Sequence, residues 1–345
     1  MTRRLLPLLA LVALLAGCGA KSDTTTAGSG HTEPLTVMLD WFPNADHAGL
    51  YAAQASGEYE RAGLDVKFVT PSDAATPLKL VEAGRVDLAI SYEPDVMLAR
   101  DQGADVVAVG ALVQRPLTAL MSLGDKGVTR PQQLAGRTVG TAGIPYQSAY
   151  LKTILRRAGV DPGSVKEVNV GFKLVQAMLA KKVDATIGAF WNVEGIQLQQ
   201  AGRKPRIERI EDLGVPRYDE LVFAARRKDL DEAGASRIRR FMQATARGFQ
   251  LVRRDPAKGV DVLLKANPDL DRAQTAASLR ATLPAFFPED RARPWGWQDP
   301  AQWSAYEHWM RSSNLLKPLV RGERAPLTNE FLPGEGLDQG TSGLG

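Results

Sequence analysis

Short apolar runs alternate with longer stretches of helical period between Pro34 and about Arg226. Leu64, Val66 and Phe68 alternate with polar residues, which is the period of a half-buried strand. The same reasoning predicts strands at residues 35–39, 86–90, 106–112, 138–140, 166–170 and 183–188, and helices at 48–56, 78–83 and 149–158. Strands separated by helices indicate parallel sheets with helices on both faces.

The pattern changes to consecutive helices beyond Ala235, with an apolar stripe that includes Phe241 and Phe249. Further helices are predicted at 258–265, 273–283 and 301–312. Two α/β units followed by helices predict a bilobal α/β protein, with lobe one formed by residues 34–120 and 224–345 and lobe two by residues 121–223. We expect the chain to cross between the lobes near 117–123 and 221–226. A ligand cleft should lie between them, at the carboxyl ends of the strands.

The first residues have the composition of an export signal. Arg3 and Arg4 precede a run at 5–15 that is nearly all Leu and Ala, and this run is too short to span a membrane. The residues Leu-Ala-Gly-Cys at 15–18 are similar to a bacterial lipobox, which implies a signal peptide at 1–17 and a diacylglycerol on Cys18; an ordinary signal peptide that contains a cysteine is the alternative. Small polar residues at 18–33 then predict a flexible tether. The expected location is extracytoplasmic and lipid-anchored.

Composition excludes several classes of site. Cys18 is the only cysteine, so neither an internal disulfide nor a multi-cysteine metal site is possible. The chain has 43 Lys and Arg against 39 Asp and Glu, and the basic residues are interleaved with acids, as at 206–212. No basic stripe alternates with aromatic residues, so we expect no nucleic-acid partner. We also expect no metal and no cofactor.

The segment 39–51 has the sequence Leu-Asp-Trp-Phe-Pro-Asn-Ala-Asp-His-Ala-Gly-Leu-Tyr and connects the first predicted strand to the first helix. Asp40, Trp41, Asn44 and His47 therefore belong at the edge of the cleft. An indole beside several hydrogen-bonding groups suits a flat heteroaromatic ligand, because stacking supplies affinity and polar groups supply orientation. The alternatives are a core position for Trp41, helix capping by Asp40 or Asn44, and a capped or packed His47.

Two further strand ends supply candidates for the cleft. Tyr92 and Glu93 follow the predicted strand 86–90, although Tyr92 alternatively packs between helices. The turn Gly-Thr-Ala-Gly-Ile-Pro-Tyr at 140–146 opens a helix, so Gly143, Pro145 and Tyr146 should bring backbone donors from lobe two. The spacing is not that of a phosphate-binding P-loop.

The run Gly-Ala-Phe-Trp-Asn-Val-Glu-Gly at 188–195 follows the strand 183–188. It places Trp191 and Asn192 just before Glu194, at the start of a helix. We expect these three side chains to face the cleft from lobe two. The alternative for Glu194 is that it only complements the helix dipole.

These motifs resemble those of the thiamin-pyrimidine-synthase-like family, especially its bacterial binding proteins for thiamin pyrimidine precursors. The resemblance rests on 39–51, 84–99, 140–145, 295–303 and 327–332, and so covers nearly the whole chain after the tether. It implies a fold like that of type II periplasmic binding proteins and a 4-aminopyrimidine ligand. In that ligand site Tyr92 would stack on or edge against the ring, and Glu194 would accept a hydrogen bond from the exocyclic amine. An ABC permease and its ATPase would be the partners of a monomer.

The same resemblance leaves other functions open. Eukaryotic members of the family synthesise the pyrimidine with a lysine, a histidine and a cysteine-rich motif, but the matching positions here are Ser91, Asp95 and the cysteine-free segment 218–224. The resemblance therefore argues against an enzyme. Other cargoes in the family, such as riboflavin, sulfonates or nitrate, are alternatives, as is a sensor that does not transport.

Overall fold

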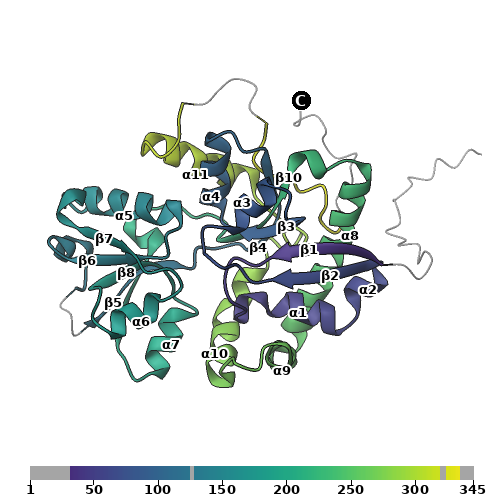
Figure 1. The fold of residues 1–345 in the computed structure, drawn as a ribbon, viewed down its shortest axis with the longest axis horizontal. Coiled ribbons are helices and arrows are strands. Elements are labelled where there is room, and N and C mark those ends of the chain that lie inside the picture. The colour runs from purple at the N-terminus through teal and green to yellow at the C-terminus, as the bar shows by residue number, and fades with distance from the viewer. Residues whose placement is uncertain (1–31, 125–127, 319–323, 335–345) are drawn as a thin grey trace, which may run out of the picture.

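The computed structural model describes residues 32–124, 128–318 and 324–334. The predicted signal peptide, Cys18 and nearly all of the predicted tether lie outside the described residues. Within them the chain forms an α/β protein of two lobes, each with a five-stranded sheet covered by helices (Figure 1). No helix of the described ranges is both long and apolar enough to cross a membrane.

The sheet of lobe one has the strand order β2-β1-β3-β10-β4. Its strands are β1 (Glu33–Met38), β2 (Leu64–Val69), β3 (Leu88–Ser91), β4 (Val106–Val113) and β10 (Leu221–Arg226). β1 runs parallel to β2 and β3, whereas β10 runs antiparallel to both β3 and β4. Every residue of β3 and β4 is buried, as expected for strands covered on both faces.

The sheet of lobe two has the order β7-β6-β8-β5-β9. Its strands are β5 (Thr118–Leu123), β6 (Thr138–Thr141), β7 (Lys166–Asn169), β8 (Ala185–Phe190) and β9 (Pro205–Arg209). β6 pairs in parallel with β7 and β8, and β5 runs antiparallel to β8 and β9. The two sheets therefore repeat one plan, a parallel set of three strands joined to a reversed strand.

This plan corrects two of our expectations. The sheets are mixed rather than parallel, because the strand that enters each sheet from the other lobe is reversed. The segments predicted as crossings, 117–123 and 221–226, are largely the strands β5 and β10 themselves. The chain crosses just before each of them, so the first residues of β5, which we expected in lobe one, pair within the sheet of lobe two. β9 was not predicted.

The helices cover both faces of each sheet and link the lobes. They are α1 (Ala48–Ala55), α2 (Glu58–Arg61), α3 (Pro77–Glu82), α4 (Glu93–Asp101), α5 (Pro145–Arg157), α6 (Leu174–Leu179), α7 (Glu194–Gln200), α8 (Glu232–Arg254), α9 (Pro256–Ala266), α10 (Arg272–Thr282) and α11 (Pro300–Ser312). The predicted apolar stripe of α8 is buried, and its polar member Thr245 hydrogen-bonds the hydroxyl of Tyr59 at 3.0 Å. Asp231 caps this helix by accepting from the N–H of Gly234 at 2.8 Å.

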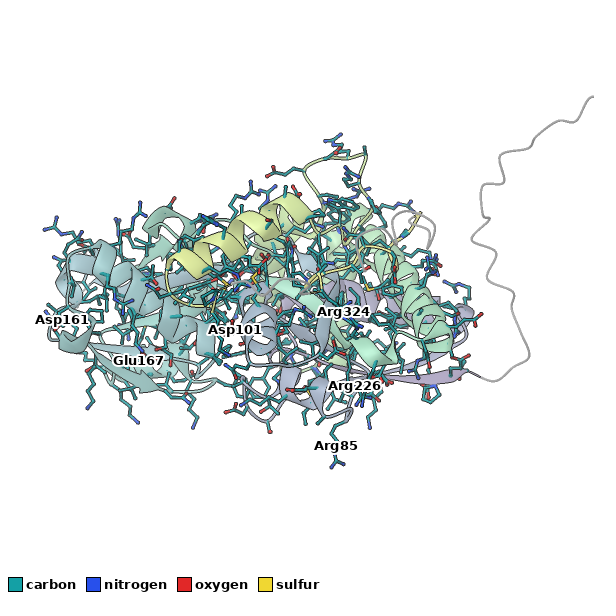
Figure 2. All side chains as sticks on the ribbon, turned by 90° about the horizontal axis from the view of Figure 1, so that it is seen from above. Arg85, Asp101, Asp161, Glu167, Arg226 and Arg324 are labelled. Carbon is teal, nitrogen blue, oxygen red and sulfur yellow. The ribbon has the colours of Figure 1, made fainter. Side chains whose placement is uncertain are left out.

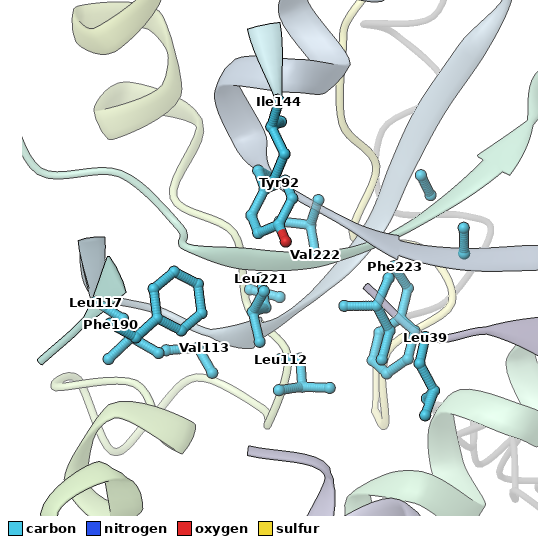
Figure 3. Close-up of a cluster of buried hydrophobic side chains, with 14 of the residues drawn as sticks. Leu39, Tyr92, Leu112, Val113, Leu117, Ile144, Phe190, Leu221, Val222 and Phe223 are labelled. Atoms are coloured by element: carbon cyan, nitrogen blue, oxygen red, sulfur yellow. The ribbon is translucent and has the colours of Figure 1, made fainter. Parts of the chain in front are cut away.

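Apolar side chains fill the region where the chain crosses between the lobes. Val113 and Leu117 of the outward crossing lie near Phe190 and Leu221, with Tyr92 and Ile144 above them (Figure 3). Many charged side chains project outward, among them Arg85 and Asp161 on the two lobes (Figure 2). The lobes therefore share a hydrophobic junction directly beneath the cleft.

The crossing of α1 and α8 depends on two glycines. A Cβ on Gly248 would lie 2.2 Å from the backbone oxygen of Gly49, and a Cβ on Gly49 would lie 2.2 Å from the ring of Phe249. Because one neighbour is backbone, the two helices would have to separate to accept a side chain.

We expect Gly248→Ala to lower the free energy of unfolding by about 2 kcal/mol, because overpacking outweighs the gain of about 1 kcal/mol in helix propensity. Urea denaturation followed by circular dichroism measures this change. Gly259→Ala in α9 is the control, since its Cβ would meet no backbone atom and only the side chain of Val252, at 3.1 Å. Equal stability of Gly248→Ala and the unmodified protein would show that the helices do not depend on this contact.

A candidate ligand site between the lobes

A cavity of about 330 Å³ lies between the two lobes. Lobe one contributes the loop after β1 and the residue after β3, and lobe two contributes the start of α5, the end of β8 and the start of α7. The lining residues are Asp40, Trp41, Asn44, Tyr92, Ile144, Tyr146, Gln147, Gly188, Phe190, Val193 and Glu194.

Aromatic rings from both lobes meet beside the cavity at Trp41. Trp41 meets Phe172, from the loop between β7 and α6, edge to face at a centroid distance of 4.5 Å. Phe42 contacts the same ring at 4.6 Å and remains half exposed. We call Trp41, Phe42 and Phe172 the aromatic rim. Since Phe172 belongs to lobe two, the rim exists only while the lobes are together.

Asp40 is held by two partners on lobe one. Its Oδ1 lies 2.9 Å from Nε2 of His47, and its Oδ2 accepts from the hydroxyl of Tyr92 at 3.1 Å. Nδ1 of His47 accepts from the N–H of Asn44, so Nε2 carries the proton that goes to Asp40. The side chain of Asn44 is also occupied, because it accepts from the N–H of Asp46 and donates to the carbonyl of Phe42. Asp40 and Asn44 line the cavity, whereas His47 does not line it and instead holds Asp40 in place.

Two tyrosines meet across the cleft. Tyr92 of lobe one and Tyr146 of lobe two are both buried, with ring centroids 5.2 Å apart. Burial and the neighbouring Asp40 raise the pKa of Tyr92 well above its usual value, so its phenol stays protonated and donates. The pair forms an aromatic floor to which both lobes contribute.

Glu194 is the acid that faces the cavity from lobe two. Its Oε2 accepts from the N–H of Phe190 at 2.7 Å, which fixes the carboxylate at the end of β8. Burial raises its pKa to about 7, and the nearby acids Asp46 and Asp40 add to this effect. A carboxylate can accept about four hydrogen bonds, so Glu194 retains capacity for a ligand.

Asn192 joins the lobes beside the cavity. Its Nδ2 donates to Oδ1 of Asp46 at 2.8 Å and to the hydroxyl of Thr282 at 2.6 Å. All three side chains are fully buried, and Asp46 and Thr282 belong to lobe one. Burial raises the pKa of Asp46 to about 7. We call these three residues the interlobe latch; Asn192 lies in the latch and not on the cavity wall, contrary to our expectation.

Four other expected ligand residues do not line the cavity. The guanidinium of Arg209 lies 4.2 Å from the ring centroid of Trp191, whose indole N–H donates to the carbonyl of Pro116. Glu93 accepts from the N–H of Asp219 inside the junction. Gly143, with φ of 81°, faces Asn169, and Pro145 borders a different depression beside α3 and α4. For Trp191 and Glu93, a nearby structural partner takes the group that we expected to meet the ligand.

The sequence reasoning missed several residues of the wall. Ile144 and Gln147 adjoin the predicted turn, and Gly188, Phe190 and Val193 belong to the run that pointed to Glu194. Only their neighbours in sequence could have indicated them. Phe172 of the rim carries no signal of its own in the sequence.

The cavity wall offers no cation. Its polar residues are acids, amides and phenols, and it contains no Lys or Arg. Among the described residues, no cluster of His, Cys, Asp and Glu has the arrangement of a metal site. The position where we expect the lysine of the pyrimidine-forming enzymes is Ser91, buried at the end of β3.

Comparison with characterised proteins finds relatives over the whole chain. A formylaminopyrimidine-binding protein of Halalkalibacterium halodurans is 34% identical over 327 residues, which cover 93% of this chain and 97% of that protein. The riboflavin-binding protein RibY of Chloroflexus aurantiacus is 27% identical, over 94% of this chain and 96% of that protein. A 4-amino-5-hydroxymethyl-2-methylpyrimidine phosphate synthase of Legionella pneumophila is 26% identical, over 73% of this chain and 79% of that protein.

Solved structures share the fold. The alkanesulfonate-binding protein SsuA of Xanthomonas axonopodis superposes with a TM-score of 0.64 at 17% identity, covering 84% of this chain and 96% of that one. This confirms the expected fold of periplasmic binding proteins. The family model described as NMT1/THI5 like matches residues 44–259. That match and the 34% identical relative confirm the resemblance seen in the sequence, and the chain belongs to the NMT1/THI5-like family.

Proposed function

We propose that this protein is the extracytoplasmic, lipid-anchored solute-binding component of an ABC importer, and that it binds a thiamin-precursor aminopyrimidine of the hydroxymethylpyrimidine or formylaminopyrimidine type. The observation that carries the proposal is the cavity between the lobes, whose wall combines aromatic rings with Glu194 and has no cation. An aminopyrimidine presents a flat ring for stacking and an exocyclic N–H for a carboxylate. The formylaminopyrimidine-binding relative supports this choice of ligand.

Binding in this proposal proceeds by closure of the lobes. The ring would stack near Trp41 and Tyr92 on lobe one, and lobe two would then cover it with Tyr146 and Glu194. The aromatic rim and the interlobe latch support closure, because both join residues of the two lobes. A ligand of about ten heavy atoms at roughly −1 kcal/mol per atom reaches micromolar affinity or better.

The cavity favours this cargo over the alternatives. Sulfonate and nitrate carry negative charge, and acids that lack a neighbouring Lys or Arg disfavour such anions. Riboflavin is as stackable but much larger than a pyrimidine, whereas aromatic rings of the two lobes already meet at centroid distances of 4.5 Å and 5.2 Å across the cleft. The riboflavin-binding relative keeps that cargo as the second candidate.

We infer a binding role and not an enzymatic one. The segment 218–224, where a cysteine-rich motif would be expected, has no cysteine, and Ser91 cannot form a Schiff base. The permease and ATPase partners, the lipid on Cys18 and the monomeric state belong to the same proposal. The tether then keeps the binding protein close to its permease.

The direct test is mass spectrometry of small molecules released from the protein purified without its lipid, followed by calorimetry. We expect an aminopyrimidine to be released and to bind again with micromolar affinity or better. A panel of riboflavin, alkanesulfonates and nitrate serves as the comparison. Tight binding of one of these, with no affinity for aminopyrimidines, would refute the proposed cargo.

Trp41 and Trp191 form a matched pair of variants. Trp41→Ala should weaken aminopyrimidine binding about tenfold, since stacked aromatic contacts contribute roughly 0.5–1.5 kcal/mol beyond the area that they bury. Trp191→Ala should leave affinity nearly unchanged, because its ring packs on Arg209 outside the cavity. Calorimetry of both variants checks this, and the opposite ranking would move the stacking site to lobe two.

Glu194→Gln tests the acid at constant shape. At pH 8 the carboxylate is ionised, so the variant should bind an aminopyrimidine about tenfold more weakly, as expected for a lost charge-assisted hydrogen bond. In the ligand-free protein the raised pKa gives stability that is complete below pH about 4.5 and is lost as the pH rises to about 7.

The melting temperature of the unmodified protein should therefore fall relative to that of Glu194→Gln between pH 5 and pH 8. Thermal denaturation in matched buffers measures this difference. Parallel pH profiles of the two proteins would show that Glu194 does not titrate in this range.

A further inference from the structure

Most polar side chains of the cavity wall already have partners. Asp40 accepts from His47 and from the hydroxyl of Tyr92, and Asn44 accepts from the N–H of Asp46 and donates one proton to the carbonyl of Phe42. The hydroxyl of Thr118 donates to Glu220, so the contact of 3.4 Å between Tyr146 and Thr118 uses the proton of Tyr146. On the part of the wall that lobe two contributes, Glu194 retains acceptor capacity and Gln147 retains one amide proton. On lobe one, Trp41 and Asn44 each keep an N–H and Asp40 keeps unused lone pairs.

Gln147 is held in one orientation. Its side chain is 1% exposed, and Oε1 accepts from the N–H of Ala142 at 2.7 Å. That bond identifies Nε2 as the opposite end of the amide, which carries two protons. One of them is directed to the hydroxyl of Tyr146, where it opposes the effect of burial on the pKa of that phenol.

Gly188 leaves room for this amide. A Cβ on Gly188 would lie 2.1 Å from Nε2 of Gln147, and the φ of Gly188 is 101°, which favours glycine. The register between β5 and β8 shifts at this point, so Gly188 is the extra residue of a β-bulge. The bulge places the amide of Gln147 on the cavity wall with no side chain beneath it.

We propose that Gln147 is a specificity-determining residue, whose Nε2 donates its second proton to an acceptor atom of the bound ligand. Glu194 is fixed by the N–H of Phe190, two residues beyond Gly188 on the same strand. Gly188 and Phe190, against which the donor and the acceptor lie, are therefore about 7 Å apart along β8. Lobe two then hydrogen-bonds both a donor and an acceptor of the same ligand, through Glu194 and Gln147 respectively.

This inference rests on the proposed function and deepens it. An aminopyrimidine with a substituted arm has an exocyclic amine for Glu194. Its acceptors for Gln147 are a ring nitrogen and the oxygen of the arm. A site that offered only carboxylates would bind any flat amine. The amide of Gln147 adds a requirement that the ligand also carry an acceptor atom.

The test uses calorimetry with Gln147→Glu and Gln147→Met. Gln147→Glu keeps an oxygen for the N–H of Ala142 but removes the donor, and Gln147→Met removes the amide without adding charge. Gln176→Glu, exposed on α6 of the same lobe, controls for the added charge. The ligands are 4-amino-5-hydroxymethyl-2-methylpyrimidine, its 5-methyl analogue, and analogues with either ring nitrogen replaced by C–H.

We expect both Gln147 variants to bind the hydroxymethyl compound about tenfold more weakly than the unmodified protein, while Gln176→Glu is unchanged. For the analogue that lacks the acceptor atom bound by Gln147, the unmodified protein and the variant should bind with nearly equal affinity, so that the ratio of their affinities falls to about one. If the affinities become equal for the 5-methyl compound, the arm oxygen is the acceptor of the Gln147 proton. If they become equal for a C–H analogue, the replaced ring nitrogen is the acceptor.

An equal loss for every ligand, or no loss, would overturn the inference while the proposed function stands. If the unmodified protein bound no aminopyrimidine, both would fall. Circular dichroism and melting temperatures show that the variants are folded. Because Gln147→Glu retains the bond to Ala142, an unfolded Gln147→Met leaves the test intact.

Discussion

The common wall between the two lobes depends on the interlobe latch, in which Asn192 of lobe two donates to Asp46 and Thr282 of lobe one. These side chains have no exposed surface, so separating them would replace protein partners by water. Oδ2 of Asp46 and Oδ1 of Asn192 are buried without partners. The latch therefore holds the lobes together through directed hydrogen bonds and at the same time retains a local cost that opening removes.

Buried hydrogen bonds also connect the two crossing segments at the junction below the cavity. Glu220, just before β10, accepts from the N–H groups of Leu117 and Thr118 and from the hydroxyl of Tyr218. One carboxylate thus ties the returning chain to the outgoing chain. Burial raises its pKa to about 7, so the same buried setting that makes the bonds strong also disfavours the charge. Latch and junction together explain how two lobes with separate sheets keep a common wall.

Much of the architecture could be predicted because the local spacing of apolar residues indicates the individual strands and helices. Strand β2 shows a period of two and helix α8 shows an apolar stripe, and both elements formed as expected. The direction of β5 and β10 could not be predicted, since an apolar run looks the same in either orientation. For the site, position after a strand identified Asp40, Trp41, Tyr92 and Glu194. The same rule failed for Trp191, because Arg209 reaches its ring from a strand that the pattern did not reveal.

If the proposed function holds, the aromatic rim couples the size of the bound compound to the position of the lobes. Trp41 belongs both to the cavity wall and to the contact with Phe172, so one indole touches the ligand space and the opposite lobe. A compound that fits beneath the indole lets the rings meet, whereas one that projects past it holds them apart. In the proposed function, contact between the rings would thus convert the bulk of a small molecule into the spacing of two domains.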